Sequence, residues 1–153
     1  MRKNTLVLSL IALLCLQTFA YPRIKHCEDA RVTGIYTIVL DKWAVDAICD
    51  MDTDGGGWLV ILNRRGGYED FYKPWNTYKD EGIGSPETEY VLPLEFLHAY
   101  LSQDKFEFLQ EMTEGAEHAW DRFSFLSIGS EEEKFQLKLG RRDSTSIVPP
   151  DDI

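Results

Sequence analysis

Hydrophobic and polar positions follow two different periods along the chain, which predicts a mixed α+β fold. Apolar runs bounded by glycine, aspartate or asparagine predict strands at 34–40, 44–49 and 58–62, the last as a buried strand between two glycine turns. In the second half, alternating apolar and polar positions predict strands at 105–112, 120–128 and 133–139. The turns between these three later segments favour an antiparallel meander.

Two segments carry apolar residues at helical spacing. Phe71, Trp75 and Tyr78 recur at i, i+4 and i+7. We interpret this aromatic stripe, Trp75 included, as core packing, with a carbohydrate-stacking platform as the alternative. A second helix is expected from Pro93 to about Gln103, because proline suits a first helical position and leucines follow on one stripe.

The most informative stretch is CDMDTDGGGW at 49–58. Gly55, Gly56 and Gly57 can take positive φ at successive positions, so the chain is expected to turn tightly there. Trp58 then opens the following strand, and we interpret it as the point where this turn meets the core.

Calcium binding is the competing interpretation of the same stretch. Asp50, Asp52, Asp54 and the following glycine match the first half of an EF-hand loop. Position twelve of such a loop must supply a bidentate carboxylate, and here it is Ile61. An acidic, solvated turn is therefore favoured, and no metal site is expected.

Residues 1–20 have the pattern of a secretory signal peptide: a basic start, an apolar run and small residues before the expected cleavage point. The apolar run is too short to span a membrane, for which about twenty apolar residues are needed. We therefore expect a secreted, extracellular protein without a membrane span.

The acidic balance of the chain argues against polyanionic partners. The full sequence carries a net charge of −10, and loss of Arg2 and Lys3 with the signal peptide would leave −12. Nucleic acids and anionic membranes select basic surfaces, so neither is an expected partner.

Cysteine usage predicts one disulfide. Cys15 would leave with the signal peptide, so Cys27 and Cys49 remain with a single intramolecular connectivity in an oxidising compartment. Closing this loop should stabilise the fold by about 3 kcal/mol. Two thiolates without histidines at ligand spacing cannot complete a zinc site.

No arrangement of nucleophile, base and oxyanion donors can be assembled from the sequence, so we do not expect an enzyme. His26, His98 and His118 lack a recognisable nucleophilic partner, and we interpret them as packed or hydrogen-bonded side chains.

Several segments closely resemble the fibrinogen C-terminal domain family. Those that carry the resemblance are CED at 27–29, TGIYTI at 33–38, CDMDTDGGGW at 49–58, DFYKPWNTYKD at 70–80, EYVL at 89–92, FSF at 123–125 and GSEEEKFQL at 129–137. The resemblance covers residues 27 to about 140 and is most specific in the glycine-rich block.

This resemblance implies an α+β fold, with a disulfide-bonded N-terminal subdomain and a mostly antiparallel central sheet with flanking helices. In the family, a C-terminal subdomain carries calcium, and lectin members bind acetylated sugars there. After Gly140 this sequence departs from the family pattern, without the usual calcium ligands, second cysteine pair or acetyl pocket. We therefore expect a partial domain at 21–140, a disordered tail at 141–153 and no calcium cofactor.

By resemblance, the expected function is a secreted, non-enzymatic recognition protein of the lectin-like, innate-immune type, with the calcium and acetyl-sugar site missing. Its expected partners are an extracellular protein or glycan, or related chains in an oligomer. The alternative is a truncated isoform or fragment that acts only as a scaffold or partner-binding chain. The ligand-binding residues are not identified.

Overall fold

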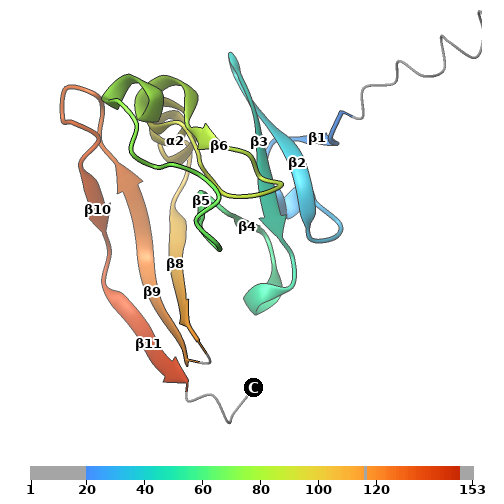
Figure 1. Ribbon diagram of the computed structural model, residues 1–153, viewed down its shortest axis with the longest axis vertical. Helices are drawn as coiled ribbons and strands as arrows, with labels where there is room; N and C mark the ends of the chain where they lie inside the picture. Colours follow the sequence, from blue (N-terminus) through green and yellow to red (C-terminus); the bar gives the residue numbers. More distant parts are fainter. Residues whose placement is uncertain (1–19, 116, 149–153) are drawn as a thin grey trace, which may run out of the picture.

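The computed structural model of the chain describes residues 20–115 and 117–148. The expected signal peptide lies outside the described residues, apart from Ala20. Three sheets and a few short helices build an α+β fold, as expected (Figure 1). Among the described residues, no helix is both long and apolar enough to cross a membrane.

The first sheet has the order β1-β2-β3-β4. Its strands are β1 (Arg23–Ile24), β2 (Gly34–Leu40), β3 (Trp43–Asp50) and β4 (Trp58–Leu59). β1 runs parallel to β2, and the other neighbours are antiparallel. β2 and β3 form because residues that favour strands, mostly β-branched and aromatic, lie on both sides of a two-residue turn. The predictions of strands at 34–40 and 44–49 are confirmed.

The disulfide between Cys27 and Cys49 is confirmed, with the two Cα atoms 5.2 Å apart. It joins the short 3-10 helix η1 (Cys27–Asp29) to the end of β3, and both cysteines are buried. The bond therefore fixes the N-terminal segment against the first sheet.

The second sheet is small, with the order β5-β7-β6. Its strands are β5 (Leu62–Asn63), β6 (Ile83–Gly84) and β7 (Tyr90–Val91). The prediction of a single buried strand over 58–62 is wrong, because this segment contributes β4 to the first sheet and the start of β5 to the second. Val60 N–H donates to Ile48 of the first sheet, whereas the Ile61 carbonyl accepts from Leu92 beside the second. The chain changes sheets between these two residues, and Leu62 is 56% exposed.

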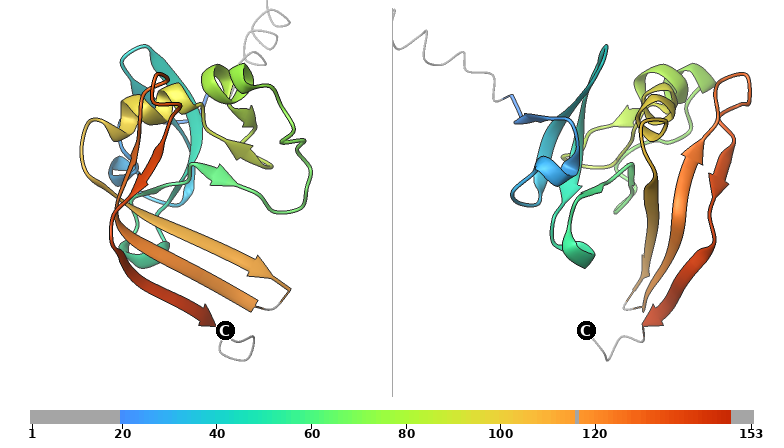
Figure 2. Two further views of the ribbon diagram at one scale, coloured as in Figure 1. Left: turned by 90° about the vertical axis from the view of Figure 1, so that its left-hand side faces the viewer. Right: turned by 180° about the vertical axis from the view of Figure 1, so that it is seen from behind.

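The third sheet is an antiparallel meander, as predicted, centred on β9 (Glu117–Ile128). β8 (Phe106–Glu114) pairs with it along its length. β10 (Leu137–Leu139) and β11 (Arg142–Val148) pair with successive parts of β9. The tip of the β8–β9 hairpin and the end of β11 extend away from the helices (Figure 2).

Two predictions in this region need correction. The segment 133–139 is a strand only from Leu137, because residues 131–135 form a turn in which Lys134 and Phe135 take positive φ. The expected disordered tail at 141–153 is wrong for Arg142–Val148, whose backbone pairs with β9. This pairing was missed because the segment has little apolar periodicity of its own. Residues 149–153 of the expected tail lie outside the described residues.

The helix α2 (Leu94–Leu101) confirms the helix expected after Pro93. The helix lies between the first and third sheets (Figure 1), and its buried side chains belong to the hydrophobic core. Phe96, Tyr100 and Phe106 form an aromatic column, with ring centroids 5.6 and 5.0 Å apart. Such pairs add to the stability gained by burying apolar area, and the column connects α2 with partly buried Phe106 of β8.

Candidate recognition surface

The glycine block is a tight turn whose backbone requires glycine. Gly55, Gly56 and Gly57 have φ of 89°, 79° and 84°. A Cβ on Gly56 would lie 2.7 Å from the Met51 carbonyl oxygen, so a larger residue cannot fit without moving the backbone. Gly55 is the last residue of the short 3-10 helix η2 (Thr53–Gly55), and Gly56 and Gly57 follow it.

The three aspartates of this block face different partners. Asp50 accepts from Thr53 Oγ1 at 2.6 Å and from the backbone of Asp52 at 2.8 Å. Partial burial raises the pKa of Asp50, but these bonds to its charged form outweigh burial and lower the pKa overall. Asp52 accepts from Thr33 Oγ1 at 2.7 Å. Within 20–115 and 117–148, no group of three metal-ligating side chains is found.

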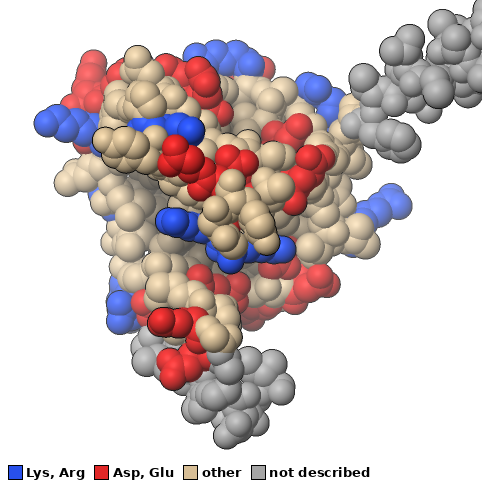
Figure 3. All heavy atoms as spheres, in the orientation of Figure 1, with Lys and Arg blue, Asp and Glu red and all other residues tan. Residues whose placement is uncertain are grey.

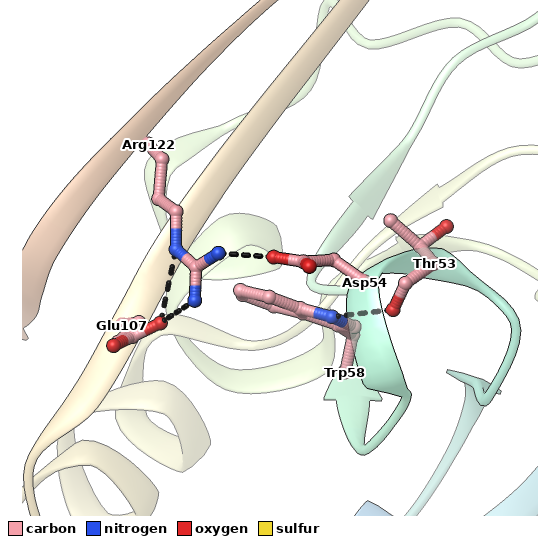
Figure 4. A network of polar contacts seen from close by, with 5 residues as sticks. All are labelled: Thr53, Asp54, Trp58, Glu107 and Arg122. Atoms are coloured by element: carbon pink, nitrogen blue, oxygen red, sulfur yellow. Dashed lines mark hydrogen bonds and ion pairs between the residues drawn. The ribbon is translucent and has the colours of Figure 1, made fainter. Parts of the chain in front are cut away.

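The third aspartate, Asp54, pairs with Arg122 of β9 (Figure 4). The Arg122 guanidinium also donates to Glu107 of β8, with its Nε 3.1 Å from the carboxylate oxygen. Both carboxylates raise the pKa of Arg122, Glu107 through its hydrogen bond first. The arginine thus joins the glycine block to the third sheet.

Trp58 lies beside this arginine. The Arg122 guanidinium is 5.7 Å from the centre of its ring, and the indole Nε1 donates to the Thr53 carbonyl at 3.0 Å. Trp58 is only partly buried and does not belong to the buried core. The structure therefore places it at the contact between the turn and the third sheet.

An exposed aromatic loop spans residues 66–75 and begins with the turn at Gly66 and Gly67. Tyr68 is 78% exposed, Tyr72 is 96% exposed and Trp75 is 49% exposed. Core packing of Trp75 is only partly correct: its ring centre lies 5.8 Å from that of buried Phe135, while half of its surface stays exposed. Phe71, Trp75 and Tyr78 recur at helical spacing, but the helix begins only at Trp75 and continues into the π-helix η3 (Thr77–Glu81). Phe71 therefore lies outside the helix, and the three side chains do not form one helical stripe.

A buried carboxylate holds the start of the aromatic loop. Glu89, with 0% exposure, accepts the backbone N–H groups of Arg65 and Gly67 at 2.7 Å and that of Glu69 at 2.9 Å. The N–H of Gly66 donates to the same carboxylate at 2.5 Å. These bonds, that from Glu69 first, lower the pKa of Glu89 to about 2 although burial opposes them. The ionised carboxylate fixes a loop that has no strand partner.

Further contacts fix the rest of the loop. Tyr78 Oη donates to the Phe71 carbonyl at 2.7 Å, and the Arg64 guanidinium lies 5.3 Å from the centre of the Phe71 ring. Asp70 accepts from the backbone of Tyr72 at 2.9 Å. Tyr72 is therefore held by its backbone while its ring stays in solvent.

Sequence reasoning missed both Glu89 and Arg122 as organising residues. A signal for Glu89 is present: it is an acid at the start of an otherwise apolar stretch, EYVL, where a buried charge requires several donors. No local pattern distinguishes Arg122, because its partners lie 15 and 68 residues away in sequence.

Two of the three histidines, His98 and His26, have the hydrogen-bonding roles expected of them. His98 Nδ1 lies 2.8 Å from the Ile128 carbonyl, and His26 Nδ1 lies 3.3 Å from Tyr100 Oη. His118 Nε2 is 3.7 Å from Glu111. Each contact joins separate elements of the fold.

Charged side chains of both signs are mixed on the face shown in Figure 3. Acidic side chains form several groups, with Lys and Arg side chains between them (Figure 3). This mixing lowers the local attraction for a polyanion, in keeping with the negative net charge.

The fold, the glycine block and the disulfide together define a fibrinogen-like globular domain. The family model of the C-terminal globular domain of fibrinogen beta and gamma chains matches residues 24–146, so the chain belongs to this family. The match extends past residue 140, where the domain was expected to end, and includes most of β11.

Tenascins are among the similar proteins. Tenascin of Gallus gallus is 34% identical over 134 residues, which cover 82% of this chain and 7% of the relative. Human tenascin-R is 32% identical over 118 residues, which cover 75% of this chain and 9% of the relative. The chain thus spans less than a tenth of these two relatives.

Solved structures give the same fold. The fibrinogen-like globe domain of human ANGPTL6 matches with a TM-score of 0.75 and 26% identity, over 84% of this chain and 61% of that one. Lamprey fibrin D-dimer, solved with a Gly-His-Arg-Pro-amide peptide ligand, matches with a TM-score of 0.72, over 91% of this chain and 49% of that one. At 21% identity, the latter likeness shows the fold alone.

Proposed function

We propose that the chain is a secreted, non-enzymatic recognition protein, of the lectin-like, innate-immune type, that binds an extracellular protein or glycan through its aromatic loop. The observation that carries this proposal is the exposure of Tyr68, Tyr72 and Trp75 on a loop held from beneath by buried Glu89. Membership in the fibrinogen-related family supports an extracellular binding role.

The physical argument rests on preorganisation. Tyrosine and tryptophan offer large rigid surfaces with a polar tip, and they are enriched where proteins bind partners. A loop already fixed by hydrogen bonds loses little conformational freedom when a ligand binds. The four backbone N–H donors on Glu89 and the Tyr78–Phe71 hydrogen bond supply this order before any ligand arrives.

Binding should not require calcium, because the aromatic loop acts through ring faces and hydroxyl groups. The oxidised, secreted chain is screened on a glycan array, on immobilised N-acetylglucosamine and on a panel of extracellular matrix proteins, in calcium and in EDTA. We expect a ligand whose retention is equal in the two buffers. Retention that EDTA abolishes would contradict this part of the proposal.

Loop variants test the residues involved. Tyr72→Ala and Trp75→Ala should each weaken binding to that ligand by at least about tenfold, since interface aromatics carry much of the binding energy. Val32→Ala is the matched control, because Val32 is also an exposed apolar side chain, at 65%, but belongs to the first-sheet region. Equal binding by all three variants, or no ligand in any screen, would refute the proposal.

A second candidate function is that of a scaffold that pairs with a related chain. Several apolar side chains of the third sheet are exposed: Met112 at 51%, Phe125 at 41% and Leu137 at 54%. Light scattering across a concentration series should then show an oligomer that Leu137→Glu weakens. A monomer at every concentration would exclude self-association.

A further inference from the structure

A groove with a volume of about 420 Å³ lies between the first and second sheets. Trp43 to Asp46 of β3 form one wall, and residues around β6 and β7 form the other. The volume is within the range of small-ligand sites and exceeds that of a single side chain. None of the residues of the aromatic loop lines it, so this groove is a separate feature.

The charged residues that line the groove are all acidic, and the nearby Lys42 ammonium lies over the Trp43 ring, 5.0 Å from its centre. The lining contains three acidic residues, Asp46, Asp80 and Glu81, and no lysine or arginine. Asp80 lies 3.7 Å from Lys79 Nζ, but that ammonium is closer to Glu131, at 3.0 Å. In the part of the chain that the structure describes, Glu81 and Asp46 have no ion-pair partner. Trp43, Val45 and Pro86 add apolar surface to the lining.

One wall of the groove is an open strand edge. β3 pairs with β2 from Trp43 to Cys49, but with β4 only at Cys49 and Asp50. Ile48 turns its backbone away from β2, since its N–H donates to Tyr90 Oη at 3.1 Å and its carbonyl accepts from Val60 at 3.0 Å. The direction of the backbone N–H and C=O groups alternates along a strand, so those of Ala44 and Asp46, like those of Ile48, point away from β2.

Open backbone donors and acceptors pair readily with an added strand. For Ala44 and Asp46, no further backbone partner is found within 20–115 and 117–148. A row of free backbone groups therefore lies along a groove whose side chains are acidic and apolar. These two observations are independent of each other and point to the same kind of occupant.

We propose that this groove binds an extended basic segment of another extracellular protein, which adds as a strand to the edge of β3 at 43–47. The backbone of the segment pairs with Ala44 and Asp46. Alternate side chains of an extended segment point to the same face, so a lysine or arginine at every second position meets Asp46, Asp80 and Glu81. The acidic net charge of −10 favours the approach of such a partner.

The test uses the full secreted chain and a fluorescein-labelled hexapeptide of alternating threonine and arginine. Fluorescence anisotropy should show saturable binding that weakens as salt rises, and a threonine–glutamate hexapeptide should not bind. Two N-methylated versions of the arginine peptide, methylated on its threonines or on its arginines, test strand pairing. We expect one of the two to lose binding, because only one set of N–H groups faces β3.

Charge-removing variants locate the site. Asp46→Asn combined with Glu81→Gln should weaken binding of the arginine peptide about five- to tenfold. Asp46→Asn keeps an oxygen acceptor for Thr37 Oγ1, which donates to Asp46 at 2.6 Å, so the fold should be retained. Asp104→Asn combined with Glu117→Gln removes the same charge from exposed positions elsewhere and should leave binding unchanged.

Three results would overturn the proposal. The arginine peptide fails to bind, the two double variants weaken its binding equally, or both N-methylated peptides bind as well as the parent. The last two would show general attraction to an acidic protein instead of pairing at β3. Because the aromatic loop is untouched in every variant, failure here leaves the proposed function of that loop to its own test.

Discussion

Arg122 on β9 donates a hydrogen bond to Asp54 of the glycine block, 68 residues earlier in the sequence. The same guanidinium reaches Glu107 and lies over the Trp58 ring. The turn that is most characteristic of the sequence is thus held against the third sheet by one side chain (Figure 4).

Replacing Arg122 by lysine should weaken this contact while keeping its charge. Lysine has no planar fork with which to donate to two carboxylates. Asp54 and Glu107 are 58% and 52% exposed, so solvent screens the pairs, and we expect a loss of about 0.5–1.5 kcal/mol in the free energy of unfolding. Urea unfolding measures this loss. Arg141→Lys, at a position that is 86% exposed, is the control, and equal losses would contradict the assignment.

The Glu89 carboxylate predicts a specific acid sensitivity. Its pKa falls from 4.5 to about 2 on folding, so the folded protein binds fewer protons than the unfolded chain between these values. The stabilisation is therefore complete above about pH 4.5 and is lost as the pH falls toward 2. Glu89→Gln should lower the melting temperature at pH 7 by about 5 °C or more and flatten the dependence of stability on pH below 5.

Calorimetry between pH 2 and pH 7 tests this prediction. Glu117→Gln, at an exposed position near the hairpin tip, should leave the curve unchanged. A Glu89→Gln curve parallel to that of the wild type would show that the carboxylate does not contribute in this way.

Loss of the disulfide should be the most destabilising of these changes. Cys27→Ser with Cys49→Ser opens a loop with a sequence separation of 22, which costs about 3 kcal/mol through the greater freedom of the unfolded chain. Denaturant unfolding measures the cost. Peptide mapping of the unreduced protein should recover the Cys27–Cys49 pair, and two free thiols would refute it.

Tyr90 should couple the first and second sheets. Its hydroxyl donates to the Val60 carbonyl at 2.6 Å and accepts from Ile48 N–H at 3.1 Å. Burial raises the pKa of Tyr90 to about 12, so the hydroxyl stays protonated at neutral pH. Tyr90→Phe leaves two partly buried backbone groups without this partner and should cost about 1–3 kcal/mol in urea unfolding. Tyr68→Phe removes an exposed hydroxyl and should cost nothing measurable.

Calcium should leave the melting temperature unchanged. Asp54 pairs with Arg122, whereas Asp50 and Asp52 accept from Thr53 and Thr33, and no group of three ligating side chains is found within 20–115 and 117–148. Scanning fluorimetry with and without millimolar calcium tests this expectation. A rise of several degrees would show a site that these contacts do not reveal.

Local pattern was enough to predict much of the fold. Strands β2 and β3, helix α2, the meander around β9 and the single disulfide all follow from periodicity or from cysteine count. These features depend on neighbours in sequence, or on the only pairing available. The glycine-rich block identified the family because its backbone requires glycine at Gly56.

The errors share a cause, which is dependence on partners distant in sequence. The segment 58–62 looked like one strand because its side chains are continuous, yet its backbone bonds go to two sheets. β11 has a weak pattern and depends on pairing with β9. Trp75 looked buried at helical spacing, but the helix begins too late to carry Phe71 with it. The exposed aromatic loop could not be predicted because Glu89, which holds it, lies 20 to 24 residues further along the chain.

The bond between Cys27 and Cys49 also determines how this domain would respond to mechanical pulling. Tension applied at the N-terminal end passes along the covalent chain through the two sulfur atoms to the end of β3, so the chain between the two cysteines lies outside the covalent path that bears the load. While the disulfide is intact, the 22-residue segment it closes cannot extend, which removes about 75 Å from the extension measured in a stretching experiment. Under oxidising conditions the hairpin would remain intact while the third sheet is pulled apart, and reduction would release that hidden length.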